Sequence, residues 1–229
     1  MFQLRGITKV YRKRRQEVVA FRADQLDIAD GEYVAVVGPS GSGKTTLLSL
    51  LGGMLSPDSG QVLFDGQSLY DLSLNERTRL RRERIGFVFQ TFNLIPYLTA
   101  LENVQVPLYL GRVAASAQRD RATALLEQVG LGNRLDHKPS ELSTGQQQRV
   151  ALARTLANNP RLILADEPTG NLDPESREAV LSMFDGFVRD GRTIVMVTHD
   201  PAAAERAARK VLLRDGAMEL EADVSRTAA

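Results

Sequence analysis

The stretch Gly38-Pro-Ser-Gly-Ser-Gly-Lys44-Thr45 decides how the rest of this sequence is interpreted. It matches the pattern G-x-x-x-x-G-K-[ST] between a strand-like run, Tyr33–Val37, and a helical pattern at 45–51. Its glycines allow backbone N–H groups to face a phosphate, and the helix N-terminus adds partial positive charge. The sequence therefore predicts a nucleoside triphosphate cradle made of Gly38, Pro39, Ser40, Gly41, Ser42, Gly43, Lys44, Thr45 and Thr46.

Three side chains of the cradle have specific expected contacts. Lys44 is expected to reach the β- and γ-phosphates, and the Thr45 hydroxyl is expected to ligate Mg²⁺. Thr46 adds a contact to the α-phosphate. A plain glycine-rich turn is the alternative, but the strand before the motif and the helix after it favour the cradle.

Three further apolar runs, Ile85–Phe89, 162–165 and 193–198, have the composition of buried strands. Their almost continuous apolarity is typical of parallel strands covered on both faces. Helical patterns follow several of them. The pattern that begins after Asp173-Pro174 carries one apolar face, which is typical of a core helix.

Two other regions differ from this alternation. The runs at 2–10, 18–28 and 62–64 lack intervening helices and predict an antiparallel part, with a turn at Asp65-Gly66. Between residues 91 and 142 only helical patterns occur, one of which begins at a capping box, Thr99-x-x-Glu102. The expected single domain has its core in 1–90 and 143–229 and a helical subdomain in 91–142.

A carboxylate pair, Asp166-Glu167, directly follows the run 162–165. Ligands of open α/β sheets bind at the carboxyl edge of the strands, so Asp166 is expected to hold Mg²⁺ there through its water shell. Glu167 is expected to orient and deprotonate a water beside the γ-phosphate. Alone, such a pair is usually a solvated turn. The cradle in the same chain favours the catalytic interpretation.

Polar residues also follow two other runs, Gln90 after Ile85–Phe89 and His199 after 193–198. A side-chain amide can contact Mg²⁺ or the attacking water, and an imidazole can donate to a γ-phosphate oxygen. His199 alone would be interpreted as a hydrogen-bonded strand-end residue. The shared sheet edge favours a functional role, so the catalytic candidates are Glu167, His199, Gln90 and Lys44, and the metal candidates are Thr45, Gln90 and Asp166.

A second anion site is predicted at Leu142-Ser143-Thr144-Gly145-Gln146, which opens another helical pattern. Ser143 can act as the N-cap, and Gly145 leaves room for a phosphate against the exposed N–H groups. As an isolated motif this is ordinary capping chemistry. Together with the cradle, it suggests two copies docked head to tail, each cradle facing the other copy's Ser143, Gly145 and Gln146.

Over essentially the whole chain, the order of these motifs resembles the nucleotide-binding subunit of ABC transporters. The resemblance implies an α/β P-loop NTPase core with a mainly parallel sheet, an N-terminal antiparallel β part and an inserted helical subdomain. It also implies an ATPase whose dimer sandwiches two ATP molecules, with Tyr11 stacked on adenine and residues 171–173 connecting the two sites. One departure is Thr144, where the family usually has glycine. We expect this exchange to be tolerated because Ser143 and Gly145 remain.

The segments 87–96, 102–107 and 166–173 look like the family branch of lipoprotein-release, macrolide-export and cell-division ATPases. That branch implies a separate membrane subunit with an extracytoplasmic domain, which would hold this chain at the inner face of the cell membrane. Such partners dock a short helix into a groove near the Gln90 loop. The apolar candidates for this contact are Phe92, Leu94, Ile95 and Tyr97.

The composition of the chain excludes several classes of ligand and site. The 229 residues carry 29 Lys and Arg against 28 Asp and Glu, a net charge of +1, and no cysteine. This charge argues against nucleic acid as the main ligand, and the missing cysteines exclude disulfides, thiolate metal clusters and a Cys nucleophile. Apolar runs far shorter than the ~18–20 residues of a membrane span, and a start without a signal-peptide pattern, predict a cytoplasmic location.

Three functions stay open at this point. The first is the ATPase subunit of an export or lipoprotein-release complex. The second is an ATP-dependent regulator of an extracytoplasmic enzyme, as in the division branch. The third, a soluble nucleic-acid ATPase, draws on the arginines at 12–15 and 77–84, but glutamates in or after both runs indicate solvated faces.

Overall fold

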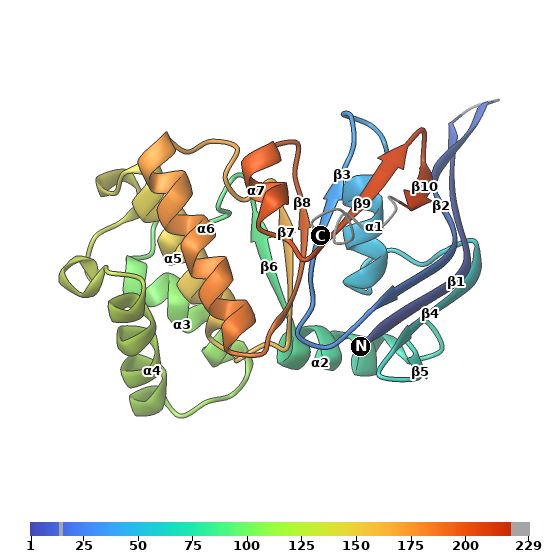
Figure 1. Cartoon of the computed structure of the whole chain (residues 1–229). Coiled ribbons are helices and arrows are strands. Elements are labelled where there is room, and N and C mark those ends of the chain that lie inside the picture. Colours follow the sequence, from blue (N-terminus) through green and yellow to red (C-terminus); the bar gives the residue numbers. More distant parts are fainter. Residues whose placement is uncertain (14–15, 221–229) are drawn as a thin grey trace.

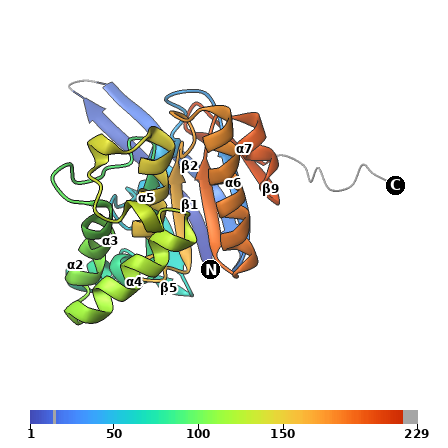
Figure 2. The ribbon, with the colours of Figure 1, turned by 90° about the vertical axis from the view of Figure 1, so that its left-hand side faces the viewer.

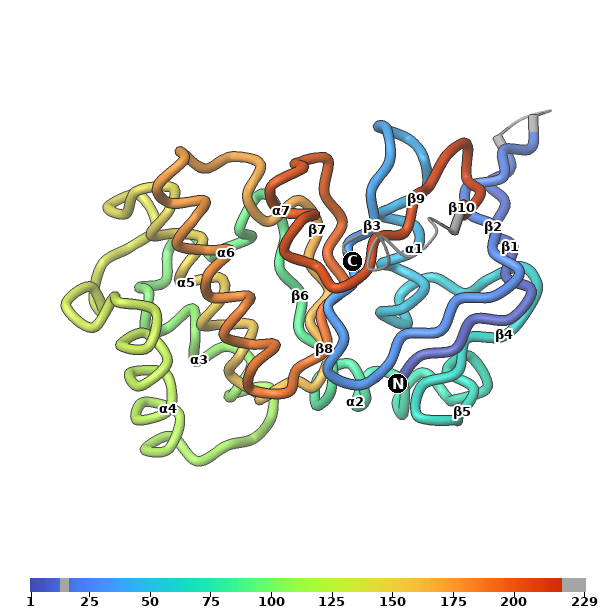
Figure 3. Tube along the Cα trace, viewed as in Figure 1, coloured from blue at the N-terminus to red at the C-terminus, as the bar shows by residue number. Residues whose placement is uncertain are grey.

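The computed structural model describes residues 1–13 and 16–220, and every structural statement below concerns these residues. A sheet with the strand order β5-β4-β1-β2-β10-β9-β3-β8-β7-β6 runs through the molecule (Figure 1). Four strands expected from apolar runs are neighbours in it, although they are far apart in the sequence (Figure 3). These parallel strands are β3 (Tyr33–Val37), β8 (Thr193–Val197), β7 (Leu162–Asp166) and β6 (Ile85–Phe89).

The expected antiparallel part is confirmed. It consists of β1 (Phe2–Lys13), β2 (Gln16–Ile28), β4 (Ser59–Phe64) and β5 (Gln67–Ser68). β1 is antiparallel to both β2 and β4. The turn at Asp65-Gly66, with φ of 50° and 79°, joins β4 to β5, and this left-handed geometry matches the twist of a tight hairpin.

A C-terminal hairpin joins the two parts of the sheet, and the sequence reasoning missed it. β9 (Arg209–Arg214) is parallel to β3, and β10 (Ala217–Leu220) is antiparallel to β9. Ala217 pairs with Arg22 of β2, which closes the junction. The turn is Asp215-Gly216, again with both φ values positive, so this dipeptide was the available hairpin signal.

The helices cover the sheet from both sides. α6 begins at the expected N-cap Asp173, and α3 and α5 begin with capping boxes at Thr99 and Ser143. The sequence reasoning missed α2 because none of its residues is buried, although Ser73 and Glu76 form a capping box before it. The helices are α1 (Lys44–Leu51), α2 (Leu74–Arg84), α3 (Ala100–Leu110), α4 (Ala115–Gln128), α5 (Thr144–Leu156), α6 (Pro174–Arg189) and α7 (Pro201–Glu205), with short 3-10 turns at Gly132–Arg134 and Pro139–Glu141.

Alternate residues of the parallel strands face two different cores. On β7, Ile163 and Ala165 join the core formed with α3, α4, α5 and α6, and Figure 2 views the molecule from this helical side. Leu162 and Leu164 join the core that contains α1 and the antiparallel strands. The strands are therefore covered on both faces, as their continuous apolarity predicted.

The helical subdomain is present, but its exact limits stay a prediction. α3 and α4 fall within 91–142, while α5, which follows residue 142, packs against both of them and against β6. In the described ranges, none of the helices combines the length and apolarity needed to cross a bilayer.

Candidate functional site

The carboxyl ends of the parallel strands open into a pocket of about 770 Å³. The loop after β3 forms one wall, and residues that follow β6, β7 and β8 form the other. Most side chains singled out in the sequence meet here. The lining residues are Tyr11, Val18, Val19, Ala20, Gly38, Pro39, Ser40, Gly41, Gly43, Lys44, Thr45, Thr46, Gln90, Asp166, Glu167 and His199.

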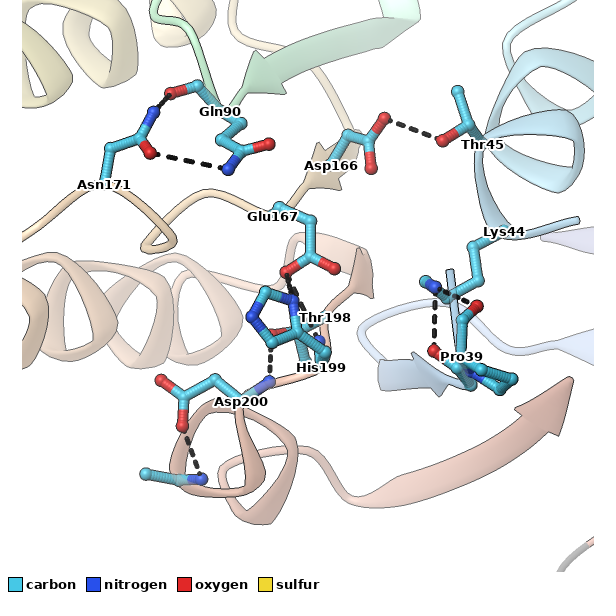
Figure 4. A network of polar contacts seen from close by, with 12 residues as sticks. Pro39, Lys44, Thr45, Gln90, Asp166, Glu167, Asn171, Thr198, His199 and Asp200 are labelled. Atoms are coloured by element: carbon cyan, nitrogen blue, oxygen red, sulfur yellow. Dashed lines mark hydrogen bonds and ion pairs between the residues drawn. The ribbon is translucent and has the colours of Figure 1, made fainter. Parts of the chain in front are cut away.

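The loop after β3 depends on its glycines. Gly41 and Gly43 have φ of 80° and 99°, and a Cβ at Gly43 would collide with the Ala20 carbonyl. The Lys44 ammonium donates to the carbonyls of Gly38 at 2.8 Å and Pro39 at 2.9 Å (Figure 4). Ser42 is the one cradle residue that does not line the pocket. Its side chain is buried, and its Oγ has no hydrogen-bond partner within the described part of the chain.

A threonine and a carboxylate meet across the pocket. The Thr45 hydroxyl donates to Asp166 Oδ2 at 3.1 Å (Figure 4). Burial raises the pKa of Asp166; donation by Thr45 opposes this shift, the Glu167 charge adds to it, and the Lys44 charge opposes it. These two oxygen groups are of the type that a hard cation prefers.

Glu167 faces His199 across the end of the sheet. Its carboxylate lies 2.8 Å from His199 Nδ1 and 3.3 Å from the His199 backbone N–H (Figure 4). Glu167 has a φ of 47°, and its own N–H donates to the Val197 carbonyl. This left-handed step turns the chain away from β7 and directs the carboxylate toward the end of β8.

Gln90 is held by a residue of the loop before α6. The Asn171 side-chain amide donates to the Gln90 carbonyl at 3.1 Å, and Gln90 Nε2 lies 3.5 Å from Asn171 Oδ1 (Figure 4). The loop that contains residues 171–173 is thus in direct contact with the pocket wall.

Three lining residues were missed by the sequence reasoning. Val18, Val19 and Ala20 of β2 form the wall next to Tyr11, which is about half exposed. The wall is backed by the β9–β10 turn, where a Cβ at Gly216 would meet the Val19 carbonyl. Strand residues without polar groups carry no local signal for lining a binding pocket.

The second predicted anion site lies elsewhere, since Ser143, Gly145 and Gln146 do not line the pocket. Ser143 caps α5: its Oγ accepts from the Gln146 N–H at 3.2 Å, and Gln146 Oε1 accepts from the Ser143 N–H at 2.9 Å. The role of Gly145 at a phosphate stays a prediction. The structure adds a packing role: a Cβ at Gly145 would collide with Ser176 of α6, so glycine permits close packing of α5 on α6.

A second hollow, of about 650 Å³, lies beside the Gln90 loop between α2, β6, α3 and α5. Of the apolar residues expected as contacts here, Phe92 and Leu94 pack against the helical core, while Ile95 and Tyr97 are exposed on the loop; none of the four lines this hollow. The groove is lined instead by Met54, Thr78, Arg81, Arg82, Ile85, Gly86, Phe87, Phe89, Asn93, Val106, Pro107, Leu110, Arg154, Thr155, Asn158 and Pro160.

Known proteins are similar to this chain over nearly its full length. Residues 21–170 match the model of the family described as "ABC transporter". The chain is 50% identical to the macrolide export ATP-binding/permease protein MacB of Syntrophobacter fumaroxidans, over 96% of this chain and 31% of that protein. It is 46% identical to the uncharacterized ABC transporter ATP-binding protein YvrO of Bacillus subtilis, over 96% of each. The chain therefore spans about a third of the MacB relative and nearly all of YvrO.

A solved structure has the same fold. It is the ATP-binding cassette MJ0796 of Methanocaldococcus jannaschii, a dimer in a post-hydrolysis state bound to ADP and Pi. The TM-score is 0.90 and the identity 44%, and the match covers 98% of this chain and 99% of that one.

The backing of the pocket wall by Gly216 can be tested. Gly216→Ala should weaken equilibrium ATP binding roughly tenfold, because the new Cβ displaces Val19 and with it the wall of the pocket. Gly66→Ala is the matched control: Gly66 has a similar φ of 79°, but a Cβ there meets nothing within 4 Å. Equal affinities in the two variants would contradict the assigned role of Gly216.

Proposed function

Because this chain belongs to the ABC transporter family and is one of its ATP-binding ATPases, we propose that it hydrolyses MgATP as a head-to-tail dimer working with a membrane subunit. The observation that carries the proposal is the single pocket in which the Lys44 loop, Asp166, Glu167, Gln90 and His199 meet.

In this proposal, the loop from Gly38 to Thr46 binds the phosphates. Lys44 exchanges its contacts with the Gly38 and Pro39 carbonyls for the β- and γ-phosphates, at little cost because both states satisfy the ammonium. Tyr11, which lines the same pocket, stacks on the adenine ring.

Mg²⁺ would be held by Thr45 and Asp166, with Gln90 as a further ligand. Thr45 Oγ1 and Asp166 Oδ2 already lie 3.1 Å apart. Among the described residues, no cluster of three or more acidic or histidine side chains could hold a metal alone. Phosphate and water oxygens would complete the shell, which is usual for Mg²⁺ bound with nucleotides. The bound cation neutralises developing negative charge on the phosphates.

Glu167 acts as the general base in the proposed reaction. It takes a proton from a water whose oxygen attacks the γ-phosphorus, and the bond from that phosphorus to the β–γ bridging oxygen breaks to give ADP and phosphate. His199 positions the Glu167 carboxylate through Nδ1 and donates to the γ-phosphate once its ring is free to turn.

The assignment of the base predicts a variant that binds but does not turn over. Glu167→Gln should keep MgATP binding, lose roughly 100- to 10,000-fold in kcat, and accumulate an ATP-bound dimer visible by size-exclusion chromatography. Glu175→Gln, an exposed carboxylate of α6 outside the pocket, is the control. Unimpaired hydrolysis in Glu167→Gln would mean that another group is the base.

The head-to-tail arrangement is supported by the distance between two predicted anion sites: within one chain, the Ser143 site does not join the Lys44 pocket. Ser143 caps α5 away from the Lys44 pocket, so its hydroxyl could meet a nucleotide only in a second copy. The related cassette MJ0796 was solved as a dimer bound to ADP and Pi. A two-fold dimer repeats each contact, so two identical composite sites would form.

Mixed dimers test this arrangement. Ser143→Arg and Lys44→Ala should each abolish hydrolysis alone, whereas their equimolar mixture should recover about a quarter of wild-type activity, because half the dimers then contain one intact composite site. Lys44→Ala mixed with Glu167→Gln is the control, since both changes affect the same chain's half of the site. A Ser143→Arg and Lys44→Ala mixture as inactive as its components would refute the arrangement.

The groove beside the Gln90 loop is the proposed docking site of the membrane subunit, which would hold the chain at the inner face of the membrane. Apolar side chains such as Phe87, Phe89 and the 60% exposed Leu110 line it, with three arginines and no carboxylate among the lining residues. This composition fits an apolar helix that carries acidic residues. MacB, named as an ATP-binding/permease protein, offers export as the process that such a complex would drive.

Charge placed in the groove should release the partner. Leu110→Asp should lower, roughly tenfold, the amount of membrane-spanning protein that co-purifies with this chain from detergent-solubilised membranes. ATP binding should be unchanged. Leu74→Asp is the control, because Leu74 is 73% exposed on α2 but outside the groove. Equal recovery with both variants would place the docking surface elsewhere.

A further inference from the structure

The loop after Gln90 has a backbone conformation that needs outside support. Phe92 and Asn93 follow each other with φ of 59° and 50°. Left-handed geometry is uncommon for residues other than glycine, and a bulky aromatic residue tolerates it poorly. Two such residues in sequence persist only where the surroundings fix them.

Arg154 of α5 provides that support. Its two terminal nitrogens donate to the carbonyls of Phe92 and Asn93, each at 2.6 Å. The planar guanidinium carries several donors in a fixed geometry, so one side chain can hold two consecutive carbonyls in one orientation. Arg154 is half-buried, and burial lowers the pKa of its guanidinium.

Thr155, the residue after Arg154, holds β6, the strand that precedes the Gln90 loop. Thr155 Oγ1 lies 2.7 Å from the Phe87 carbonyl, and its methyl group occupies the space where Gly86 lacks a side chain. Adjacent residues of α5 thus hold β6 and the loop on either side of Gln90. On the other side, Asn171 donates to the Gln90 carbonyl.

Resting on the proposed function, we infer that Arg154 is a positioning residue for the ATPase reaction. By fixing the left-handed turn at Phe92 and Asn93, it determines where Gln90 stands at the pocket. Arg154 and Asn93 also line the groove on the far side of the loop. A helix seated in the groove would contact the same guanidinium, so docking of the membrane subunit and the position of Gln90 depend on one side chain.

The experiment is a double-mutant cycle on the full chain. Arg154→Met, which keeps the length and removes the donors, should lower kcat roughly tenfold and leave KM and equilibrium ATP binding within about twofold. If Arg154 acts through Gln90, the Gln90→Ala, Arg154→Met double variant should be no slower than Gln90→Ala alone. Arg154→Lys, which can hold one carbonyl, should recover part of kcat.

Arg149→Met is the matched control. Arg149 lies on the same helix and also donates to a backbone carbonyl, that of Val129, but away from the Gln90 loop. Its effect should be small and should add to that of Gln90→Ala. If Arg154→Met does not fold, Arg154→Lys takes its place in the cycle.

Two results would overturn the inference: an unchanged kcat in Arg154→Met, or full additivity with Gln90→Ala, which indicates a merely structural role. Failure of the proposed function would look different. In that case the wild-type chain would not hydrolyse ATP, or Glu167→Gln would be as active as the wild type.

Discussion

The parallel pairing of β3, β8, β7 and β6 is the constraint on which the site depends. It brings four strand ends to one edge, and each end is followed by part of the pocket: the Lys44 loop, His199, the pair Asp166-Glu167, and Gln90. Because both faces of these strands are buried, the edge is fixed by two cores at once. Polar side chains that follow these strands can therefore meet within hydrogen-bond distance.

The parts of the fold that the sequence could predict are those with a local pattern of apolar or capping residues. β3 and β6 were placed to the residue because buried parallel strands are continuously apolar. α2 has no fully buried residue and was missed, although Ser73 and Glu76 show its capping box in the sequence. The pocket residues with polar groups were predicted, but Val18 and Val19 were not, because apolar side chains in a strand do not indicate a binding role. Strand pairing between distant residues, such as Ala217 with Arg22, has no local signal at all.

Packing also bears on two interpretations that rested on residue type alone. Gly145 was expected at a phosphate site, and the structure adds that it permits the close approach of α5 to Ser176. The apolar residues Phe92 and Leu94 had been assigned to a surface, but they stabilise the helical core. In both cases the residue type was compatible with two environments, and the packing contact became apparent only from the neighbouring element.

The length of α5 has a consequence for cooperativity. Ser143 and Arg154 lie eleven residues apart on one helix, about 16 Å at 1.5 Å per residue. In the proposed dimer, the first contacts the partner's nucleotide and the second holds the Gln90 loop of its own site. A rigid helix cannot shift at one end alone, so ATP bound by one copy alters the geometry of the other copy's active site. The two sites of the dimer would therefore be coupled through α5.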